Sequence, residues 1–231
     1  MPYYLKGENK MTEISASILN LEEENAIKKM YNLETAKIDY FHIDVMDGKF
    51  VKNNNLELMK NYALTASHIS NLGIDVHLMV ENIEEFVEEY LDLNPQIITF
   101  HIEASKTEER TKKIIDIVKE NGSRVGISIS PDTNLDEIKP YLNYIHLVLV
   151  MTVVPGLGGQ KLIPETLEKV KELKKYIDEN NIDIDIEVDG GINDITSKEA
   201  TEAGANILVV GKYLISAENM AETVKNLKGG N

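Results

Sequence analysis

Short apolar runs rich in β-branched residues alternate with helical patterns along the whole chain, and no linker or low-complexity segment interrupts them. Runs typical of buried strands occur at positions 13–19, 38–45, 74–79, 96–102, 124–129, 144–151, 182–188 and 206–210. Amphipathic helices are predicted between these runs, and one is marked by Ile83, Phe86, Val87, Tyr90 and Leu91. We expect Ser216 to be the N-cap of the last helix.

This alternation predicts parallel βα units. Eight such units in 231 residues predict a single (β/α)8, or TIM, barrel of parallel strands that spans residues 1–231. The alternative is a doubly wound open sheet, which commonly carries a GxGxxG signature after its first strand. This chain has SASILN at positions 15–20 instead, so the barrel is favoured.

The second strand-like run carries polar residues at every second position. His42, Asp44 and Met46 must therefore share one face, while Ile43 and Val45 point the other way. An imidazole and a carboxylate held side by side can ligate a divalent metal. From this segment alone, a solvated carboxylate beside an internally hydrogen-bonded histidine is an equally good interpretation.

Similar residues end other strands of the predicted barrel, at the end where barrel enzymes place their active sites. His77 and Met79 share a face of the third run, and Asp189 follows the seventh. His42, Asp44, His77 and Asp189 could thus converge on one ion, with nitrogen and oxygen ligands that suit zinc, iron, manganese or cobalt. A single histidine at a strand end is more often packed or hydrogen-bonded within the protein, but four ligand-type residues at one rim favour a metal.

Glycines gather after the last three strands, at positions 156, 158 and 159, at 190 and 191, and at 211. Glycine-rich ends of late barrel strands are where backbone N–H groups hold phosphate. Ordinary turn geometry explains each glycine alone, whereas their succession on three strands favours a phosphate group.

Composition narrows the possible partners. The chain has 24 basic and 39 acidic residues, and its net charge of −15 argues against nucleic acid. The absence of cysteine excludes disulfides, thiolate zinc sites and thiol nucleophiles. No apolar run reaches membrane-spanning length, and the first ten residues, MPYYLKGENK, do not look like a signal sequence. We therefore expect a soluble cytoplasmic protein without a membrane partner.

Six motifs in order give the chain a resemblance, over nearly its full length, to the ribulose-phosphate 3-epimerase family. They are SIL at 17–19, HxDxMDGxFVxN at 42–53, DVHLMV at 75–80, TFHxEAS at 99–105, MTVxPGxGGQ at 151–160 and EVDGG at 187–191. The resemblance implies metal-dependent interconversion of D-ribulose 5-phosphate and D-xylulose 5-phosphate through a cis-enediolate. It also implies a small phosphorylated sugar as ligand, and we expect a homo-oligomer.

The resemblance assigns roles residue by residue. One divalent ion would be held by His42, Asp44, His77 and Asp189, and Asp44 and Asp189 would also be the acid–base pair. Ser17 and His77 would contact the substrate. The phosphate would be held by Gly156, Leu157, Gly158, Gly159, Gly190, Gly191, Gly211 and Lys212. Sulfur atoms of Met46, Met79 and Met151 could lie against the enediolate, although gap-filling core methionines explain their spacing equally well.

The chain departs from the family pattern in three places. Asn20 begins a different first loop, Lys52 to Asn55 replace the residues after FV, and Lys212 stands where Ser or Thr is common. These loops are expected to touch the sugar or its phosphate, which leaves D-allulose 6-phosphate as an alternative substrate. A non-catalytic phosphate-binding barrel and a decarboxylase are further alternatives. The set of two histidines and two aspartates argues against both. A binding module needs no proton-transfer pair, and decarboxylases that resemble this family use a lysine–aspartate array.

Overall fold

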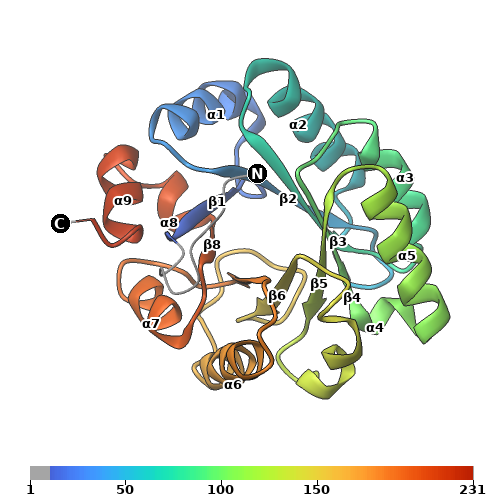
Figure 1. The fold of residues 1–231 in the computed structure, drawn as a ribbon. Coiled ribbons are helices and arrows are strands. Elements are labelled where there is room, and N and C mark those ends of the chain that lie inside the picture. Colours follow the sequence, from blue (N-terminus) through green and yellow to red (C-terminus); the bar gives the residue numbers. More distant parts are fainter. Residues whose placement is uncertain (1–10, 231) are drawn as a thin grey trace.

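The computed structural model describes residues 11–230 and contains the predicted barrel. Eight parallel strands pair in chain order from β1 to β8, and β8 pairs with β1 to close the sheet (Figure 1). The open-sheet alternative is therefore wrong. The expectation about a signal sequence concerns residues 1–10, which lie outside the described residues.

Each predicted strand-like run overlaps one strand. The strands are β1 (Glu13–Ser17), β2 (Tyr40–Met46), β3 (Gly73–Met79), β4 (Ile97–His101), β5 (Arg124–Ile129), β6 (Leu147–Met151), β7 (Asp185–Asp189) and β8 (Ile207–Val210). β6 begins three residues later than predicted, because Tyr144 belongs to a turn and its N–H donates to the carbonyl of Tyr141.

The α-helices surround the strands in the ribbon view (Figure 1). They are α1 (Ala26–Thr35), α2 (Leu56–Ile69), α3 (Ile83–Leu91), α4 (Ile102–Ser105), α5 (Glu108–Glu120), α6 (Glu165–Glu179), α7 (Thr196–Ala203), α8 (Lys212–Ile215) and α9 (Met220–Leu227). The β5–β6 connection holds only the 3-10 turns η2 (Leu135–Glu137) and η3 (Lys139–Tyr141); a third, η1 (Glu23–Asn25), precedes α1. Pro140, which cannot sit in a helix interior, lies in η3.

The expected cap of the last helix is wrong. Ser216 ends the short α8, and its hydroxyl donates to the carbonyl of Lys212. Asn219 caps α9 instead, because its side chain accepts a hydrogen bond from the N–H of Glu222.

The period-two pattern of β2 places its apolar residues in the core and its polar residues on the opposite face. Phe41, Ile43 and Val45 are fully buried in the main apolar cluster, whereas His42 and Asp44 on the other face join no apolar cluster. This alternation directs the polar residues of β2 to the barrel interior, where neighbouring strands present their own. No helix within residues 11–230 is long and apolar enough to cross a membrane.

Candidate metal centre and active site

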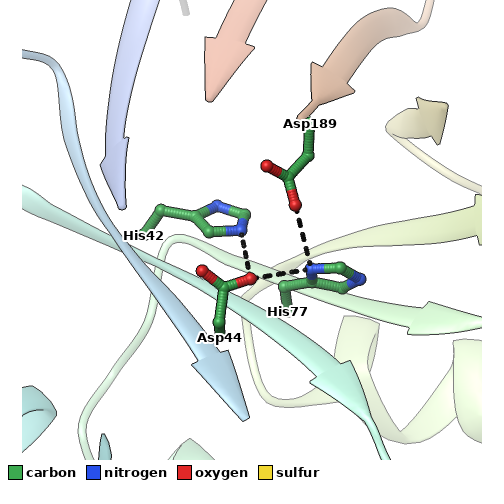
Figure 2. Close-up of side chains that lie close together, drawn as sticks. All are labelled: His42, Asp44, His77 and Asp189. Atoms are coloured by element: carbon green, nitrogen blue, oxygen red, sulfur yellow. Dashed lines mark hydrogen bonds and ion pairs between the residues drawn. The ribbon is translucent and has the colours of Figure 1, made fainter. Parts of the chain in front are cut away.

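Four side chains predicted to be ligands meet inside the carboxyl end of the barrel. One ligand atom from each of His42, Asp44, His77 and Asp189 lies within 4.8 Å of the others. Figure 2 shows the two histidines pointing toward Asp44, and Asp189 pointing toward His77. They come from β2, β3 and β7, so barrel closure is what brings Asp189 to the residues of β2 and β3.

The distances place Asp44 at the middle of this cluster. Its Oδ1 atom lies 3.4 Å from His42 Nε2 and 3.2 Å from His77 Nδ1. Asp189 Oδ2 lies 3.7 Å from the same His77 nitrogen. The other oxygen of Asp44 accepts a 2.7 Å hydrogen bond from the hydroxyl of Ser17, which fixes the orientation of the carboxylate. Sequence reasoning placed Ser17 at the substrate; in the structure its hydroxyl contacts Asp44.

A buried carboxylate orients His42. Asp75 Oδ2 lies 2.7 Å from His42 Nδ1 and accepts a second 2.7 Å hydrogen bond, from the hydroxyl of Ser15. Because a carboxylate only accepts, Nδ1 of His42 carries the donated hydrogen and Nε2 faces Asp44. Within the described residues Nε2 is buried and has no hydrogen-bond partner. An unpartnered imidazole nitrogen beside a carboxylate oxygen fits a divalent cation with nitrogen and oxygen ligands.

The raised pKa of His42 also supports a cation at this place. Burial alone would lower the pKa of His42, but the carboxylates of Asp75 and Asp44 outweigh burial and raise it well above its usual value. The site therefore attracts positive charge between His42 and Asp44. A divalent ion bound there would take the place of the proton that His42 otherwise carries.

The two aspartates differ in acidity. Burial would raise the pKa of Asp44, but the positive charge of His42 outweighs burial and holds it well below its usual value. For Asp189, burial and the negative charge of Asp44 raise the pKa to about 7. One carboxylate therefore favours the ionised form and the other lies near the neutral range, a combination that suits paired base and acid roles. A bound cation would lower the pKa of both.

Asp75 was missed as a functional residue. It precedes His77 by two positions on β3 and therefore shares its inward face, and the pairing register sets it opposite His42. The alternation that identified His77 and Met79 could have found it. Glu187, two positions before Asp189, is also fully buried, and burial beside Asp75 raises its pKa well above its usual value.

A cleft of about 280 Å³ opens over the cluster, a volume near the lower end for small-molecule sites. Asp44 and Asp189 line it, whereas His42 and His77 lie beneath. The remaining predicted site residues all line this cleft: Ser17, Met46, Met79, Met151, Gly156, Leu157, Gly158, Gly159, Gly190, Gly191, Gly211 and Lys212.

Comparison with known proteins decides the family. The model of the ribulose-phosphate 3-epimerase family matches residues 13–215. The ribulose-phosphate 3-epimerase of Methanocaldococcus jannaschii is 40% identical over 218 residues, covering 94% of this chain and 90% of the relative. The enzyme of that name from Bacillus subtilis is 34% identical over 220 residues, covering 95% and 99%. The chain belongs to the ribulose-phosphate 3-epimerase family. It is an isomerase of this family's type.

Solved structures of low sequence identity share the barrel. KGPDC from Streptococcus mutans aligns with a TM-score of 0.70 at 14% identity, covering 94% of this chain and 96% of that one. The 3-hexulose-6-phosphate synthase of Salmonella typhimurium gives a TM-score of 0.65 at 14% identity, covering 94% and 97%. At this identity the likeness concerns the fold alone.

The departures from the family pattern lie in different places. Asn20 and Lys212 line the cleft, as expected. The segment 52–55 does not line it, so the cleft gives no support to the expected contact between this segment and the substrate. Its asparagines have structural partners instead: Asn55 hydrogen-bonds to the backbone of Asp44 and Met46, and Asn53 donates to the carbonyl of Gly156.

Packing accounts for part of the glycine pattern. At Gly191, with a φ of +69°, an added Cβ would lie 2.2 Å from the backbone nitrogen of Leu162. At Gly190 the nearest atom would be a methyl carbon of Val153, at 2.4 Å. These two glycines line the cleft, and the close approach of Leu162 and Val153 also leaves no room for a side chain at either position. An added Cβ at Gly158 would meet the side chain of Asn20, and one at Gly159 would meet the side chain of Lys212.

Proposed function

We propose that this protein interconverts D-ribulose 5-phosphate and D-xylulose 5-phosphate by inverting carbon 3. The observation that carries the proposal is the placement of Asp44 and Asp189 on β2 and β7, both facing one cleft above two buried histidines. Membership of the epimerase family, and relatives named for ribulose phosphate, support the substrate.

The proposed reaction needs two carboxylates because a proton leaves one face of carbon 3 and another arrives on the opposite face. Asp44 accepts the proton from D-ribulose 5-phosphate to give a cis-enediolate, and Asp189 delivers one to the other side. The roles reverse for D-xylulose 5-phosphate. The hydroxyl of Ser17 holds one oxygen of Asp44 and leaves the other toward the histidines.

We propose that His42, Asp44, His77 and Asp189 hold one divalent ion: zinc, iron, manganese or cobalt. The buried, unpartnered Nε2 of His42 supports this ligand set, as does the absence of cysteine from the chain. When bound, the ion supplies positive charge beside the substrate oxygens on which negative charge develops.

The rest of the cleft is assigned to binding the substrate. We propose that Lys212 and the backbone of Gly156, Leu157, Gly158, Gly159, Gly190, Gly191 and Gly211 hold the phosphate. Met46, Met79 and Met151, which line the cleft beside the two aspartates, present apolar, polarizable surface to the sugar carbons. The single catalytic domain over residues 1–231, the homo-oligomer and the cytoplasmic location also stay predictions.

Metal removal tests the ligand set. Dialysis against a chelator should abolish epimerisation of D-ribulose 5-phosphate, and added zinc, manganese, cobalt or iron(II) should restore it. His77→Ala should lower both bound metal and rate. The control, His68→Ala, removes an exposed histidine of α2 and should change neither. Full activity in protein shown by elemental analysis to lack metal would exclude the metal centre.

A further inference from the structure

His77 is the first residue of a buried hydrogen-bonded chain that leads away from the cleft. Its Nε2 lies 2.9 Å from Nε2 of His101, and Nδ1 of His101 lies 3.1 Å from Oε2 of Glu103. His77 is on β3, His101 ends β4 and Glu103 lies in α4. Both histidines are fully buried, and the Glu103 side chain is 25% exposed. The proposed reaction gives His101 and Glu103 no role.

The far end of this chain is fixed as a hydrogen-bond acceptor. Oε1 of Glu103 accepts the backbone N–H of Ser130 at 2.8 Å and the hydroxyl of Thr133. Lys169 of α6 holds this loop, since its ammonium donates to the carbonyls of Ser130, Pro131 and Thr133 at 3.1, 2.7 and 2.5 Å. Burial would raise the pKa of Glu103, but hydrogen bonds from His101 and Thr133 outweigh it and lower the pKa to about 2.

The acceptor at Glu103 sets the direction of every hydrogen bond before it. His101 must donate from Nδ1 to Glu103, and a ring that is fully buried favours the neutral form. Nε2 of His101 therefore carries a lone pair and accepts from Nε2 of His77. His77, whose ring is likewise fully buried, donates from Nε2 and in its neutral form is left with its lone pair on Nδ1. That is the nitrogen that faces Asp44 and Asp189.

We propose that Glu103 and His101 are positioning residues that fix the tautomer of His77 so that Nδ1 is free to bind the metal ion. The inference rests on the proposed metal centre. Two acceptor atoms, Nδ1 of His77 and Oδ1 of Asp44, then face each other at 3.2 Å with no hydrogen between them. This arrangement is unfavourable without a cation and favourable with one, so the chain raises metal affinity from outside the ligand set.

Glu103→Gln reverses the chain with little change in shape. The N–H of Ser130 is a donor that cannot be reversed, so the glutamine must place its oxygen there and its amide NH₂ toward His101. Nδ1 of His101 then accepts, its Nε2 donates to His77, and a hydrogen appears on Nδ1 of His77. Zinc affinity should fall about 10- to 100-fold, as is usual when a residue that orients a metal ligand is changed.

Glu103→Gln should lower zinc affinity but should not lower the stability of the metal-free protein. In metal-free Glu103→Gln the new N–H of His77 can donate to Asp44, so the midpoint of urea unfolding should equal or exceed that of the metal-free parent. Glu137→Gln is the matched control, because exposed Glu137 lines the same surface hollow as Glu103 and carries the same charge. It should change neither quantity. A purely structural role for Glu103 predicts a lower unfolding midpoint instead.

The tautomers can be read directly. The chain has five histidines, so long-range ¹⁵N–¹H NMR of ring-labelled protein can assign each ring nitrogen. We expect the hydrogen on Nε2 of His77 and Nδ1 of His101 in the zinc-loaded and metal-free parent, and the reverse in metal-free Glu103→Gln. Equal zinc affinity in parent and Glu103→Gln, or a hydrogen on Nδ1 of His77 in the metal-free parent, would overturn the inference. A parent that binds no zinc would refute the metal centre itself.

Discussion

Lys212 is the cleft residue whose role in substrate binding can be tested most cleanly. It begins α8 after β8, and its side chain passes over Gly159, where an added Cβ would lie 3.4 Å from Cδ of the lysine. Its ammonium can thus reach a phosphate held by the Gly156–Gly159 loop. Lys212→Met keeps the length and apolar stem of the side chain and removes only the charge.

The expected loss is moderate. A hydrogen bond to a charged group contributes about 1.5–3 kcal/mol, but Lys212 is exposed and water screens its charge. We therefore expect about 1–2 kcal/mol, which corresponds to a roughly 5- to 30-fold fall in kcat/KM, carried mainly by KM. Inhibition by inorganic phosphate should weaken in parallel, because phosphate competes for the same charge.

Coupled spectrophotometric assay of xylulose 5-phosphate formation measures both constants. Lys52→Met is the matched control. Lys52 is an exposed lysine that follows β2, the strand that ends at Met46, but it does not line the cleft. It should leave kcat/KM and phosphate inhibition unchanged. Unchanged KM and phosphate inhibition in Lys212→Met, or equal losses in both variants, would refute the assignment of Lys212 to the phosphate.

Two further predictions concern the glycines and the sugar. Gly191→Ala should destabilise the protein far more than Gly122→Ala: both glycines have positive φ, but an added Cβ meets a backbone nitrogen at 2.2 Å at Gly191 and nothing within 4 Å at Gly122. The strained φ alone costs about 1–3 kcal/mol, and urea unfolding midpoints that are equal would contradict the packing argument. D-ribulose 5-phosphate should have a higher kcat/KM than D-allulose 6-phosphate, and the reverse order would establish the six-carbon alternative.

The barrel and its ligand set could be predicted because both follow from local periodicity. Alternation along β2 puts His42 and Asp44 on one face, and the rule that parallel strands end at one rim brings in His77 and Asp189. Neither step requires knowledge of cross-strand register. The four side chains predicted from this reasoning do meet in the structure.

The supporting residues could not be predicted because they depend on register and loop conformation. Asp75 orients His42 only because β2 and β3 pair with those two residues opposite each other. Glu103 lies two residues after His101 in the chain, but the loop after β5 fixes it as an acceptor, because the N–H of Ser130 donates to its Oε1. At the last helix, Ser216 and Asn219 are both good caps, and local sequence does not say that α8 ends before α9 begins.

The central claim is that Asp44 and Asp189 serve opposite faces of carbon 3, and Asp189→Asn tests it most directly. The variant keeps the size of the side chain and removes its proton-transfer capacity. Epimerisation should fall roughly 10²- to 10⁴-fold, as expected for a missing acid–base group. Asp194→Asn, an exposed aspartate in the loop after β7, is the matched control and should epimerise at the parent rate.

The decisive measurement is deuterium incorporation at carbon 3 in heavy water, followed by NMR for each sugar separately. In Asp189→Asn, D-ribulose 5-phosphate should exchange its carbon 3 hydrogen through Asp44 without inversion, while D-xylulose 5-phosphate should exchange much more slowly. Equal exchange from both sugars, or epimerisation at the parent rate, would show that one base serves both faces and would contradict the two-carboxylate account.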